Sequence, residues 1–311
     1  MRDNDDMTFT DLLICPLCGE KLGFAEGSSS VLRCPGGHSY DVSRAGYVNL
    51  LPPGKGRNAK TGDERDMIRA RSAFLRRGCY DPIDRAAAEL LGDALSTGDP
   101  VRGLILCDMG AGEGTHTVRI SGLLHEKTGE TVLSLGFDAS KHGAESGCRY
   151  ARSMGCFDDG GDGPVRVVCL PANLFHLPVR DGCADAALSL FAPIAWEETA
   201  RILTSGGLFL AVSSGREHLL ELRRILYDEV RFTEFHPEPP EGSPFVSLDR
   251  TTVSFSVELE TPEQIRELFT MTPFFHRVPS SGRERLERTE RLTVTAQAEL
   301  SLWRKTSPED G

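Results

Sequence analysis

The sequence has no run of 18 apolar residues, and its first six residues are acidic and polar rather than basic and then apolar. We therefore expect no membrane span and no signal peptide. Positive charge is scarce as well, because 35 Lys and Arg stand against 46 Asp and Glu, a formal net charge of -11. Since phosphate binding depends on Lys and Arg, this balance argues against a protein that coats nucleic acid indiscriminately.

Beyond the first 40 residues, the cysteines lack the regular spacing of a disulfide framework. The chain holds nine, an odd number, and six of them are scattered: Cys79, Cys107, Cys148, Cys156, Cys169 and Cys183. Cysteine used in this way is typical of a reducing compartment. We therefore expect a cytoplasmic location.

Four potential metal ligands near the start follow a pattern that no other stretch repeats. Cys15, Cys18, Cys34 and His38 are spaced C-x2-C-x15-C-x3-H, as two close pairs separated by a loop. This spacing predicts a zinc site, and buried free cysteines beside a surface histidine are the alternative. Four protein ligands leave no position for an activated water. We therefore expect a structural zinc that folds a segment too short for a core of its own.

Positive charge is concentrated in one segment of this acidic chain. Residues 44–85 carry ten basic and five acidic side chains, an excess that suits a localised contact with a polyanion. From Asp63 to Leu91 the apolar residues recur at helical spacing, and Gly78 with Asp81-Pro82 predicts a division into two helices.

From residue 101 the pattern alternates strand and helix, which predicts an α/β fold built on a parallel sheet. A late strand, helix and strand would add one reversed edge strand. Strands are expected over 104–108, 132–138, 165–169, 185–190, 208–213, 252–257 and 292–298, and helices over 115–124, 144–152, about 217–230 and 262–269. Residues 155–164 and 235–244 are expected to be insert-like loops.

A glycine-rich loop joins the first expected strand to its helix. Asp108-Met-Gly110-Ala-Gly112-Glu113-Gly114 has the spacing G-x-G-x-G and lacks the G-x-G-x-x-G of a dinucleotide fold. Asp138 ends the next strand, where it would accept hydrogen bonds from the ribose hydroxyls of an adenosine; a helix N-cap role is the alternative. Together these features favour adenosylmethionine over NAD.

Two later segments complete the expected site. Asn173 follows the third strand, where such folds contact the adenine edge, and a loop-capping role is about equally plausible. Residues 189–193, Ser-Leu-Phe-Ala-Pro, end the fourth strand and should form the substrate wall. They do not match the Asp/Asn-Pro-Pro-Tyr signature of methyltransferases that act on exocyclic amines, and no cysteine fits a cytosine-C5 nucleophile. A ring nitrogen is the target that fits both absences.

These residues together resemble the 23S ribosomal RNA guanine-N1 methyltransferases of the RlmA type, over nearly the whole chain. The resemblance rests on an ordered set of blocks: C-P-L-C with C-P-G-G-H, Gly46-Tyr-Val-Asn-Leu-Leu51, Gly62-Asp63 with Met67, Arg71-Ser-Ala-Phe74-Leu75-Arg-Arg-Gly78-Cys-Tyr80, D-M-G-A-G-E-G, Leu177-Pro178, Ala192-Pro193, His218-Leu-Leu-Glu-Leu222 and Met271-Thr-Pro-Phe274. The insert at residues 155–164, and Phe191 and Ile194 beside Ala-Pro, depart from the family pattern on the substrate side.

The resemblance implies a class I Rossmann-like methyltransferase, with a mostly parallel seven-stranded sheet and a small N-terminal zinc-binding module. It implies methyl transfer from S-adenosylmethionine to N1 of a guanosine in a domain II hairpin of 23S rRNA, free or in a ribosomal particle. Zinc would be held by Cys15, Cys18, Cys34 and His38. The cofactor would contact Tyr80, Gly112, Glu113 and His218, beside Gly110 of the same loop. A homodimer is compatible with the family.

The proton on guanine N1 needs an acceptor, or the charge developing on O6 needs stabilisation. Asp63 is a speculative base, with a helix N-cap as the stronger alternative. Arg71, Arg76 and Arg77 could pair with RNA phosphates, and a solvated helix face is about equally plausible. The target base would have to leave its stack to react.

We therefore divide the chain into a zinc-binding RNA-recognition module (1–43), a basic linker with helices (44–100) and an adenosylmethionine-dependent methyltransferase domain (101–311). Loss of zinc should weaken RNA recognition first and largely spare cofactor binding. Two alternatives remain: a small-molecule methyltransferase with a structural zinc module, and a non-catalytic RNA-binding protein.

Overall fold

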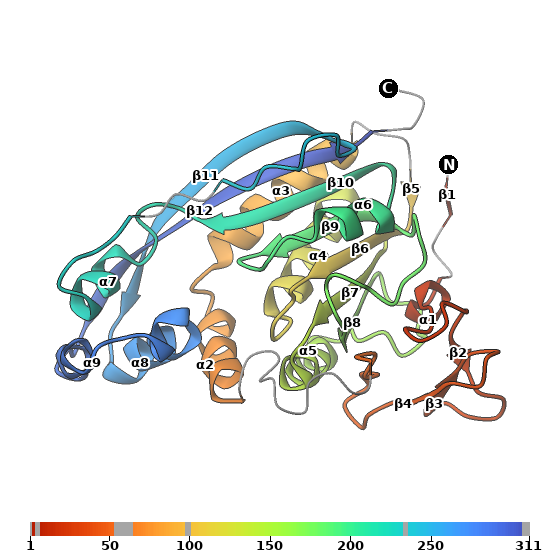
Figure 1. The fold of residues 1–311 in the computed structure, drawn as a ribbon, viewed down its shortest axis with the longest axis horizontal. Coiled ribbons are helices and arrows are strands. Elements are labelled where there is room, and N and C mark those ends of the chain that lie inside the picture. The colour runs from red at the N-terminus through yellow and green to blue at the C-terminus, as the bar shows by residue number, and fades with distance from the viewer. Residues whose placement is uncertain (1, 4–6, 53–64, 97–100, 233–235, 307–311) are drawn as a thin grey trace.

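A seven-stranded sheet forms the centre of the computed structural model, which describes residues 2–3, 7–52, 65–96, 101–232 and 236–306 (Figure 1). The strand order is β11, β12, β10, β9, β6, β7, β8. Its strands are β6 (Leu104–Met109), β7 (Val132–Asp138), β8 (Val165–Pro171), β9 (Ala184–Leu190), β10 (Leu203–Ser214), β11 (Phe245–Leu259) and β12 (Leu292–Lys305). The neighbours from β10 to β8 are parallel, and β12 is antiparallel to both β10 and β11. This topology confirms the predicted class I Rossmann-like fold.

The position of the reversed strand corrects one expectation. It was expected at the sheet edge, but β12 lies between β10 and β11, and β11 forms the edge. The composition of β12 and β11 explains this strand order. Val294, Ala296, Ala298, Leu300 and Leu302 of β12 are almost fully buried, as an internal strand requires. Most of β11 between its ends is exposed and polar, which suits a strand with one free edge.

Helices cover both faces of the sheet (Figure 1). The expected helix near residues 217–230 is shorter than predicted, because the left-handed Leu219 precedes its first turn and Tyr227 is extended. Among the described residues, no helix is long and apolar enough to cross a membrane. The helices are α1 (Phe9–Leu12), α2 (Arg65–Arg76), α3 (Asp81–Ser96), α4 (Thr115–Thr128), α5 (Lys141–Ser153), α6 (Trp196–Ile202), α7 (Leu220–Leu226), α8 (Pro262–Met271), α9 (Ser280–Glu287) and the 3-10 helix η1 (Pro273–His276).

Two apolar cores lie against the sheet, because successive residues of a strand point to opposite faces. In β6, Leu104 and Leu106 enter a core shared with α3 and α4. Ile105 and Cys107 enter the other core, which contains residues of α5 and α6 and also Leu12, Leu13 and other side chains of the N-terminal segment. The N-terminal segment is therefore packed into the main fold.

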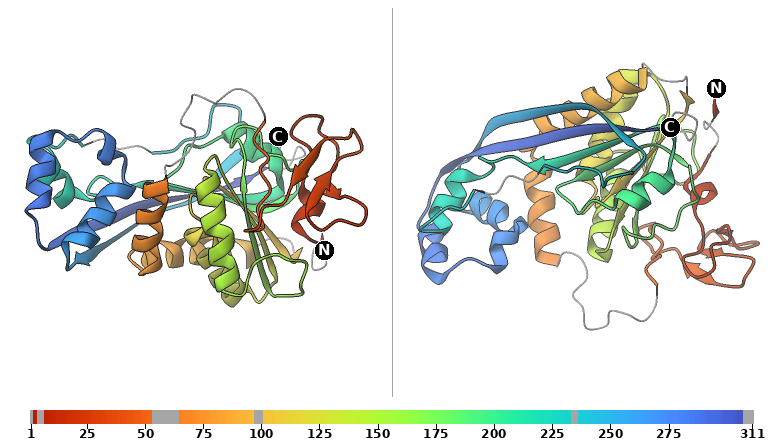
Figure 2. Two further views of the ribbon diagram at one scale, coloured as in Figure 1. Left: turned by 90° about the horizontal axis from the view of Figure 1, so that it is seen from below. Right: turned by 45° about the horizontal axis from the view of Figure 1, so that its top comes forward.

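A three-stranded sheet of β2 (Gly23–Phe24), β3 (Val31–Arg33) and β4 (Ser39–Asp41) forms the N-terminal module. Ahead of it, β1 (Arg2–Asp3) pairs with β5 (Val101–Arg102). The module lies at one end of the molecule, and α8 and α9 lie at the other (Figure 2). The predicted division of the chain at residues 43 and 100 stays a prediction.

Candidate functional site

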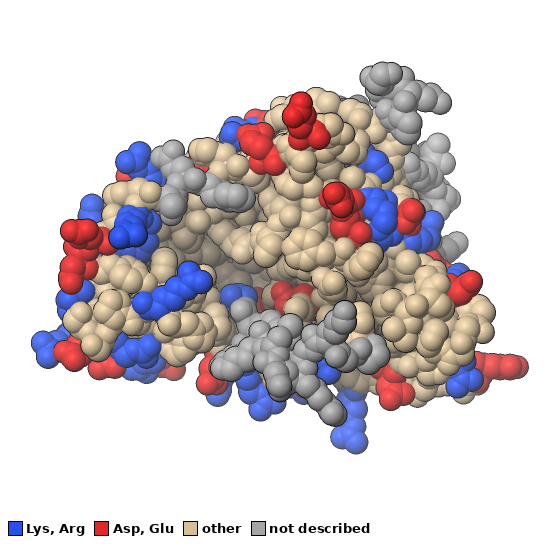
Figure 3. All heavy atoms as spheres, viewed as in Figure 1, with Lys and Arg blue, Asp and Glu red and all other residues tan. Residues whose placement is uncertain are grey.

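A cavity of about 780 Å³ lies at the carboxyl ends of β6, β7, β9 and β10. It is lined by residues 110–113, after β6, by Asp138, the last residue of β7, and by Ala139. Residues 189–194, the end of β10 and Met271 to Phe274 also line it. Open α/β sheets bind ligands at this edge. On the face drawn in Figure 3, the surface is hollowed between the region of α8 and α9 and the body of the sheet.

The glycine loop takes a backbone path that side chains would block. Gly110, Gly112 and Gly114 all have positive φ, of 103°, 56° and 81°. A Cβ at Gly110 would lie 2.3 Å from the Cβ of Ala192, and one at Gly114 would lie 2.7 Å from the Cα of Gly147. The loop therefore packs between α5 and the segment after β9, with Gly110 and Gly112 lining the cavity.

Asp138 and Asn173, both predicted to contact the cofactor, take different positions. Asp138 lines the cavity, and its carboxylate accepts hydrogen bonds from the backbone N–H of Gly112 (3.1 Å) and of Ser140 (2.7 Å). Ser140, rather than Asp138, is the N-cap of α5. Asn173 is exposed, and its Oδ1 accepts the N–H of Phe175 (3.1 Å), a turn-capping role. Its neighbour Leu174 lines the cavity; a contact of Asn173 with adenine stays a prediction.

Tyr80 and His218 both line the cavity and meet there, although 138 residues separate them. The Nδ1 of His218 accepts the backbone N–H of Gln297 in β12 (3.2 Å), so a neutral ring carries its proton on Nε2. That proton lies toward the hydroxyl of Tyr80, 3.2 Å away. Burial lowers the pKa of His218 to about 4 and raises the pKa of Tyr80. Both side chains are therefore uncharged at neutral pH.

Glu113 anchors the glycine loop to α2. Its side chain is 1% exposed and accepts hydrogen bonds from the hydroxyls of Ser72 and Thr115 (both 2.9 Å), and it pairs with Arg76 at 3.3 Å. These contacts satisfy a buried carboxylate that would otherwise be costly. Glu113 thus lines the cavity as a fixed negative group.

The three arginines predicted to bind phosphate differ in their surroundings. Arg71 lines the cavity and donates to the backbone carbonyl of Met271 (3.2 Å). Arg77 is paired with Glu267 of α8, as Arg76 is with Glu113. Phosphate binding by these side chains stays a prediction, and for Arg76 and Arg77 it would compete with ion pairs inside the protein. Asp63, the speculative base, lies outside the described residues.

A histidine that the sequence did not reveal also lines the cavity. His116 is the second residue of α4, and its Nδ1 lies 2.5 Å from the Oδ1 of Asp84 in α3. Burial lowers the pKa of His116, but the Asp84 carboxylate outweighs this and raises it. The pair is 32 residues apart in sequence, so no local pattern signals it.

The four predicted metal ligands converge in the N-terminal module. Their ligand atoms all lie within 4.8 Å of one another. The Sγ atoms of Cys18 and Cys34 are 3.6 Å apart, and the Nδ1 of His38 lies 3.5 Å from Cys15 and 3.4 Å from Cys34. Zinc bonds of about 2.0 to 2.3 Å in a tetrahedron require separations of about 3.3 to 3.8 Å, so these three distances fit one zinc ion. The hydroxyl of Tyr40 lies 3.2 Å from the Sγ of Cys15 as a supporting contact.

The zinc module is joined to the cavity by backbone pairing. Leu13 forms an antiparallel bridge with Val179. The N–H of Ile14 donates to the carbonyl of Pro178 (2.9 Å), and the N–H of Arg180 donates to that of Leu12 (3.0 Å). Cys15 comes directly after this pairing. The segment 172–181 therefore runs from the cavity, at Leu174, to the edge of the metal module.

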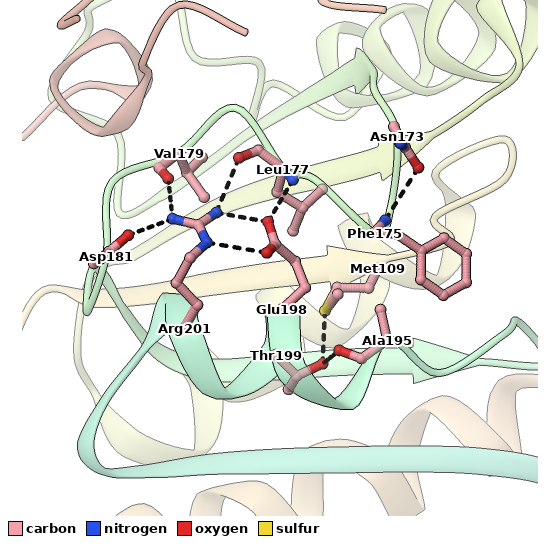
Figure 4. Close-up of polar contacts among 10 residues, drawn as sticks. All are labelled: Met109, Asn173, Phe175, Leu177, Val179, Asp181, Ala195, Glu198, Thr199 and Arg201. Carbon is pink, nitrogen blue, oxygen red and sulfur yellow. Dashed lines mark hydrogen bonds and ion pairs between the residues drawn. The ribbon is translucent and has the colours of Figure 1, made fainter. Parts of the chain in front are cut away.

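An arginine from α6 holds the other side of this segment (Figure 4). The guanidinium of Arg201 donates to the carbonyls of Leu177 (3.0 Å) and Val179 (2.8 Å), and it pairs with the carboxylates of Asp181 and Glu198 (both 2.6 Å). Glu198 in turn accepts the N–H of Leu177. The family-like Leu177-Pro178 block is thus fixed between α6 and the zinc module.

Comparisons with known proteins agree with these features. The family described as RlmA, N-terminal, a zinc ribbon, matches residues 13–57. A protein of Micromonospora griseorubida, named a candidate 23S rRNA (guanine-N1)-methyltransferase, is 34% identical over 220 residues, 68% of each chain. The chain belongs to the RlmA-type 23S rRNA (guanine-N1)-methyltransferase family.

Two further relatives carry related names. The 23S rRNA (guanine(748)-N1)-methyltransferase of Streptomyces fradiae is 35% identical over 68% of this chain and 66% of its own. The candidate 23S rRNA (guanine-N1)-methyltransferase YxjB of Bacillus subtilis strain 168 is 27% identical over 94% of this chain and 96% of its own. Membership in this family makes the protein an adenosylmethionine-dependent methyltransferase with a structural zinc.

Proposed function

We propose that the protein transfers a methyl group from S-adenosylmethionine to N1 of a guanosine in a domain II hairpin of 23S rRNA. The proposal rests on the similarity to relatives named 23S rRNA (guanine-N1)-methyltransferases. The backbone pairing that joins the zinc module to the segment lining the cavity supports it. Adenosylmethionine supplies a methyl group that is already electrophilic. The protein therefore mainly has to align the two reactants, exclude water from them and accept the proton of N1. A cytoplasmic location and assembly as a homodimer stay predictions.

The lining of the cavity suggests places for the ribose, the carboxylate and the methyl group of the cofactor. The Asp138 carboxylate would receive the ribose hydroxyls, since it ends β7 and lines the cavity. The raised pKa of His116 favours an imidazolium in the first turn of α4, and this cation would suit the methionine carboxylate, as would Arg71. Tyr80 and His218 would then border the reacting methyl group.

Among the described residues of the cavity lining, the carboxylates are Glu113 and Asp138, both beside the glycine loop. Around Tyr80 and Phe191 the lining consists of apolar, hydroxyl and aromatic side chains with His218. The hydroxyl of Tyr80 stays protonated and can stabilise charge that develops on O6. Asp63 keeps its place as a candidate base, and Asp63→Asn in a single-turnover assay tests it, because a near-normal rate excludes that role.

Methylation assays on 23S rRNA transcripts and on a panel of small aromatic metabolites test the function. We expect methyl transfer to the domain II hairpin only, and a reverse-transcription stop at one guanosine, because N1 methylation blocks base pairing. Transfer to a metabolite but not to RNA would favour the small-molecule alternative. Failure to bind adenosylmethionine in calorimetry would favour the non-catalytic one.

A further inference from the structure

Phe191 lines the cavity, and none of the proposed cofactor contacts uses its side chain. It follows β9 and is 40% exposed, whereas Leu190 before it is 6% exposed. Large exposed aromatic side chains in a cavity mark a surface that a ligand covers. Ala192, the next residue, packs against Gly110 of the glycine loop, so Phe191 lies beside the expected cofactor site, where a methyl acceptor must enter.

The backbone of Phe191 is held in a strained conformation. Its φ is 53°, in the left-handed region that phenylalanine rarely adopts, and its N–H donates to the carbonyl of Val212 in β10 (2.8 Å). The other residue of the described chain with positive φ that is not glycine is Leu219, which lines the same cavity. Strain of this kind persists where the surrounding structure fixes it, and it gathers at functional sites.

Two other aromatic side chains support the ring of Phe191. The ring of His218 is stacked on it, with centroids 5.6 Å apart and planes at 28°. The ring of Tyr80 lies at 6.0 Å and 44°. Because Gln297 and Tyr80 fix the His218 ring through its two nitrogens, one face of Phe191 is backed by a rigid layer.

The chemistry of this end of the cavity favours a neutral, planar ligand. His218 and Tyr80 are uncharged at neutral pH, and Leu190, Pro193, Ile194 and Phe274 add apolar surface. These side chains carry no charge to pair with a phosphate or a cation, and the cationic side chains of the lining, Arg71 and His116, lie beside the glycine loop. An extruded purine base would gain stacking from the free face of Phe191 and a hydrogen-bond donor from the hydroxyl of Tyr80.

We propose that Phe191 is the stacking platform for the extruded target guanine, with His218 packed behind it as a positioning residue. This inference rests on the proposed function. The predicted contacts of Tyr80 and His218 with the cofactor agree with it, since they would place the methyl group beside Phe191. The base would stack on the free face of Phe191, with its N1 edge turned toward the methyl group, because the attacking lone pair lies in the plane of the ring.

The variants Phe191→Leu and Phe191→Tyr separate stacking from folding and from cofactor binding. Phe191→Leu keeps the strained backbone and an apolar side chain but removes the aromatic face, and Phe191→Tyr retains that face. We expect Phe191→Leu to lower kcat/KM for the hairpin about 5- to 100-fold, with the dissociation constant for adenosylmethionine changed less than about twofold. Phe191→Tyr should restore most of the activity.

Fluorescence of 2-aminopurine, placed at the guanosine that methylation mapping identifies, reports the base directly. Wild type should change the emission on binding and Phe191→Leu should change it much less. Phe232→Leu is the matched control, because Phe232 is 46% exposed but lies outside the cavity lining, and it should behave as wild type.

The outcomes separate the two proposals. An unchanged 2-aminopurine signal and rate in Phe191→Leu, with wild type active on RNA, overturns the platform alone. A loss of adenosylmethionine affinity equal to the loss of rate would make Phe191 a cofactor residue and would also overturn it. Absence of RNA methylation by wild type overturns the proposed function and, with it, the platform.

Discussion

Single glycines and single rings determine the shape of this site. Gly114 begins α4 with φ of 81°, and its Cα faces Gly147 of α5 so closely that no side chain fits between them. The start of α4 can pack this closely on α5 because neither glycine has a Cβ. A single ring acts in a similar way at His218, because its two nitrogens join β12 to Tyr80.

The variant Gly114→Ala should lose stability and cofactor affinity together. Left-handed strain and a Cβ placed 2.7 Å from the Cα of Gly147 should cost roughly 2 to 4 kcal/mol in the free energy of unfolding. Urea denaturation and calorimetry with adenosylmethionine measure both effects. Gly122→Ala is the control. Gly122 lies inside α4 with open space around its Cα, so alanine there should stabilise by roughly 0.5 to 1 kcal/mol.

The stability of the protein should fall in mild acid partly through His218. The folded state holds its pKa near 4 through burial, against 6.5 in the unfolded chain. The unfolded state therefore gains a proton first, and the free energy of unfolding drops as pH falls from about 6.5 to 4. We expect this one group to contribute roughly 1 to 3 kcal/mol, allowing for its partial exposure.

Urea denaturation across this pH range, on wild type and His218→Gln, isolates that contribution. Glutamine can still accept a hydrogen bond from Gln297 and donate one to Tyr80, but it cannot be protonated. The difference in the free energy of unfolding between the two proteins should therefore narrow toward pH 4. The exposed His176→Gln should run parallel to wild type. A constant gap for His218→Gln would contradict the depressed pKa.

At this scale the sequence revealed residues whose spacing is local. Cys15 and Cys18 could be recognised from their spacing, as could Gly110 and Gly112, because the two residues of each pair lie within one turn of the chain. The sequence placed Phe191 in the expected substrate wall of residues 189–193, but nothing around a phenylalanine signals its positive φ or its stacking on His218. The pairing of His116 with Asp84 depends on how α4 packs on α3, which no local pattern contains.

Among the elements, the segment 172–181 connects the two functional regions of the molecule. It leaves the cavity at Leu174, is held by Arg201 of α6, and pairs with residues 12–14 ahead of the first zinc ligand. The Leu177-Pro178 block could be read from the sequence as family-like. Its clamp could not, because Arg201 reaches it from an element that the sequence did not predict.

Replacing Arg201 with glutamine should loosen this segment. The change leaves Glu198, whose side chain is 8% exposed, without its cation. It should destabilise the fold by about 2 to 4 kcal/mol and weaken adenosylmethionine binding through Leu174. Arg149→Gln is a matched control, because Arg149 pairs with Glu145 on an exposed helix face; its unfolding free energy should change by less than about 0.5 kcal/mol. Equal effects of the two substitutions in urea denaturation would count against a clamp.

At the scale of the whole molecule, the metal module and the methyltransferase fold share one apolar core. Leu12, Leu13 and Leu32 belong to the same buried cluster as Ile105 and Leu133 of the large sheet. The sequence predicted both parts from their separate signatures. It did not predict that the two parts share a core, since the sequence does not show which residues a buried leucine packs against.

Zinc removal should therefore destabilise the entire protein. With a chelator we expect one thermal unfolding transition at a lower midpoint, restored by added zinc, and a larger loss of affinity for the RNA hairpin than for adenosylmethionine. Cys18→Ser should no longer respond to the chelator, whereas Cys79→Ser, outside the cluster, should respond as wild type does. Two transitions, with the later one unchanged, would show that the module folds separately.

The internal place of β12 has a consequence for how the protein is made. Synthesis produces the other six strands of the large sheet first, so the groove between β10 and β11 stays empty until residues 292–305 emerge. Until then β10 has an open edge, and His218 lacks the Gln297 N–H that sets its tautomer. A nascent chain thus cannot have a finished catalytic pocket before its closing strand has been inserted.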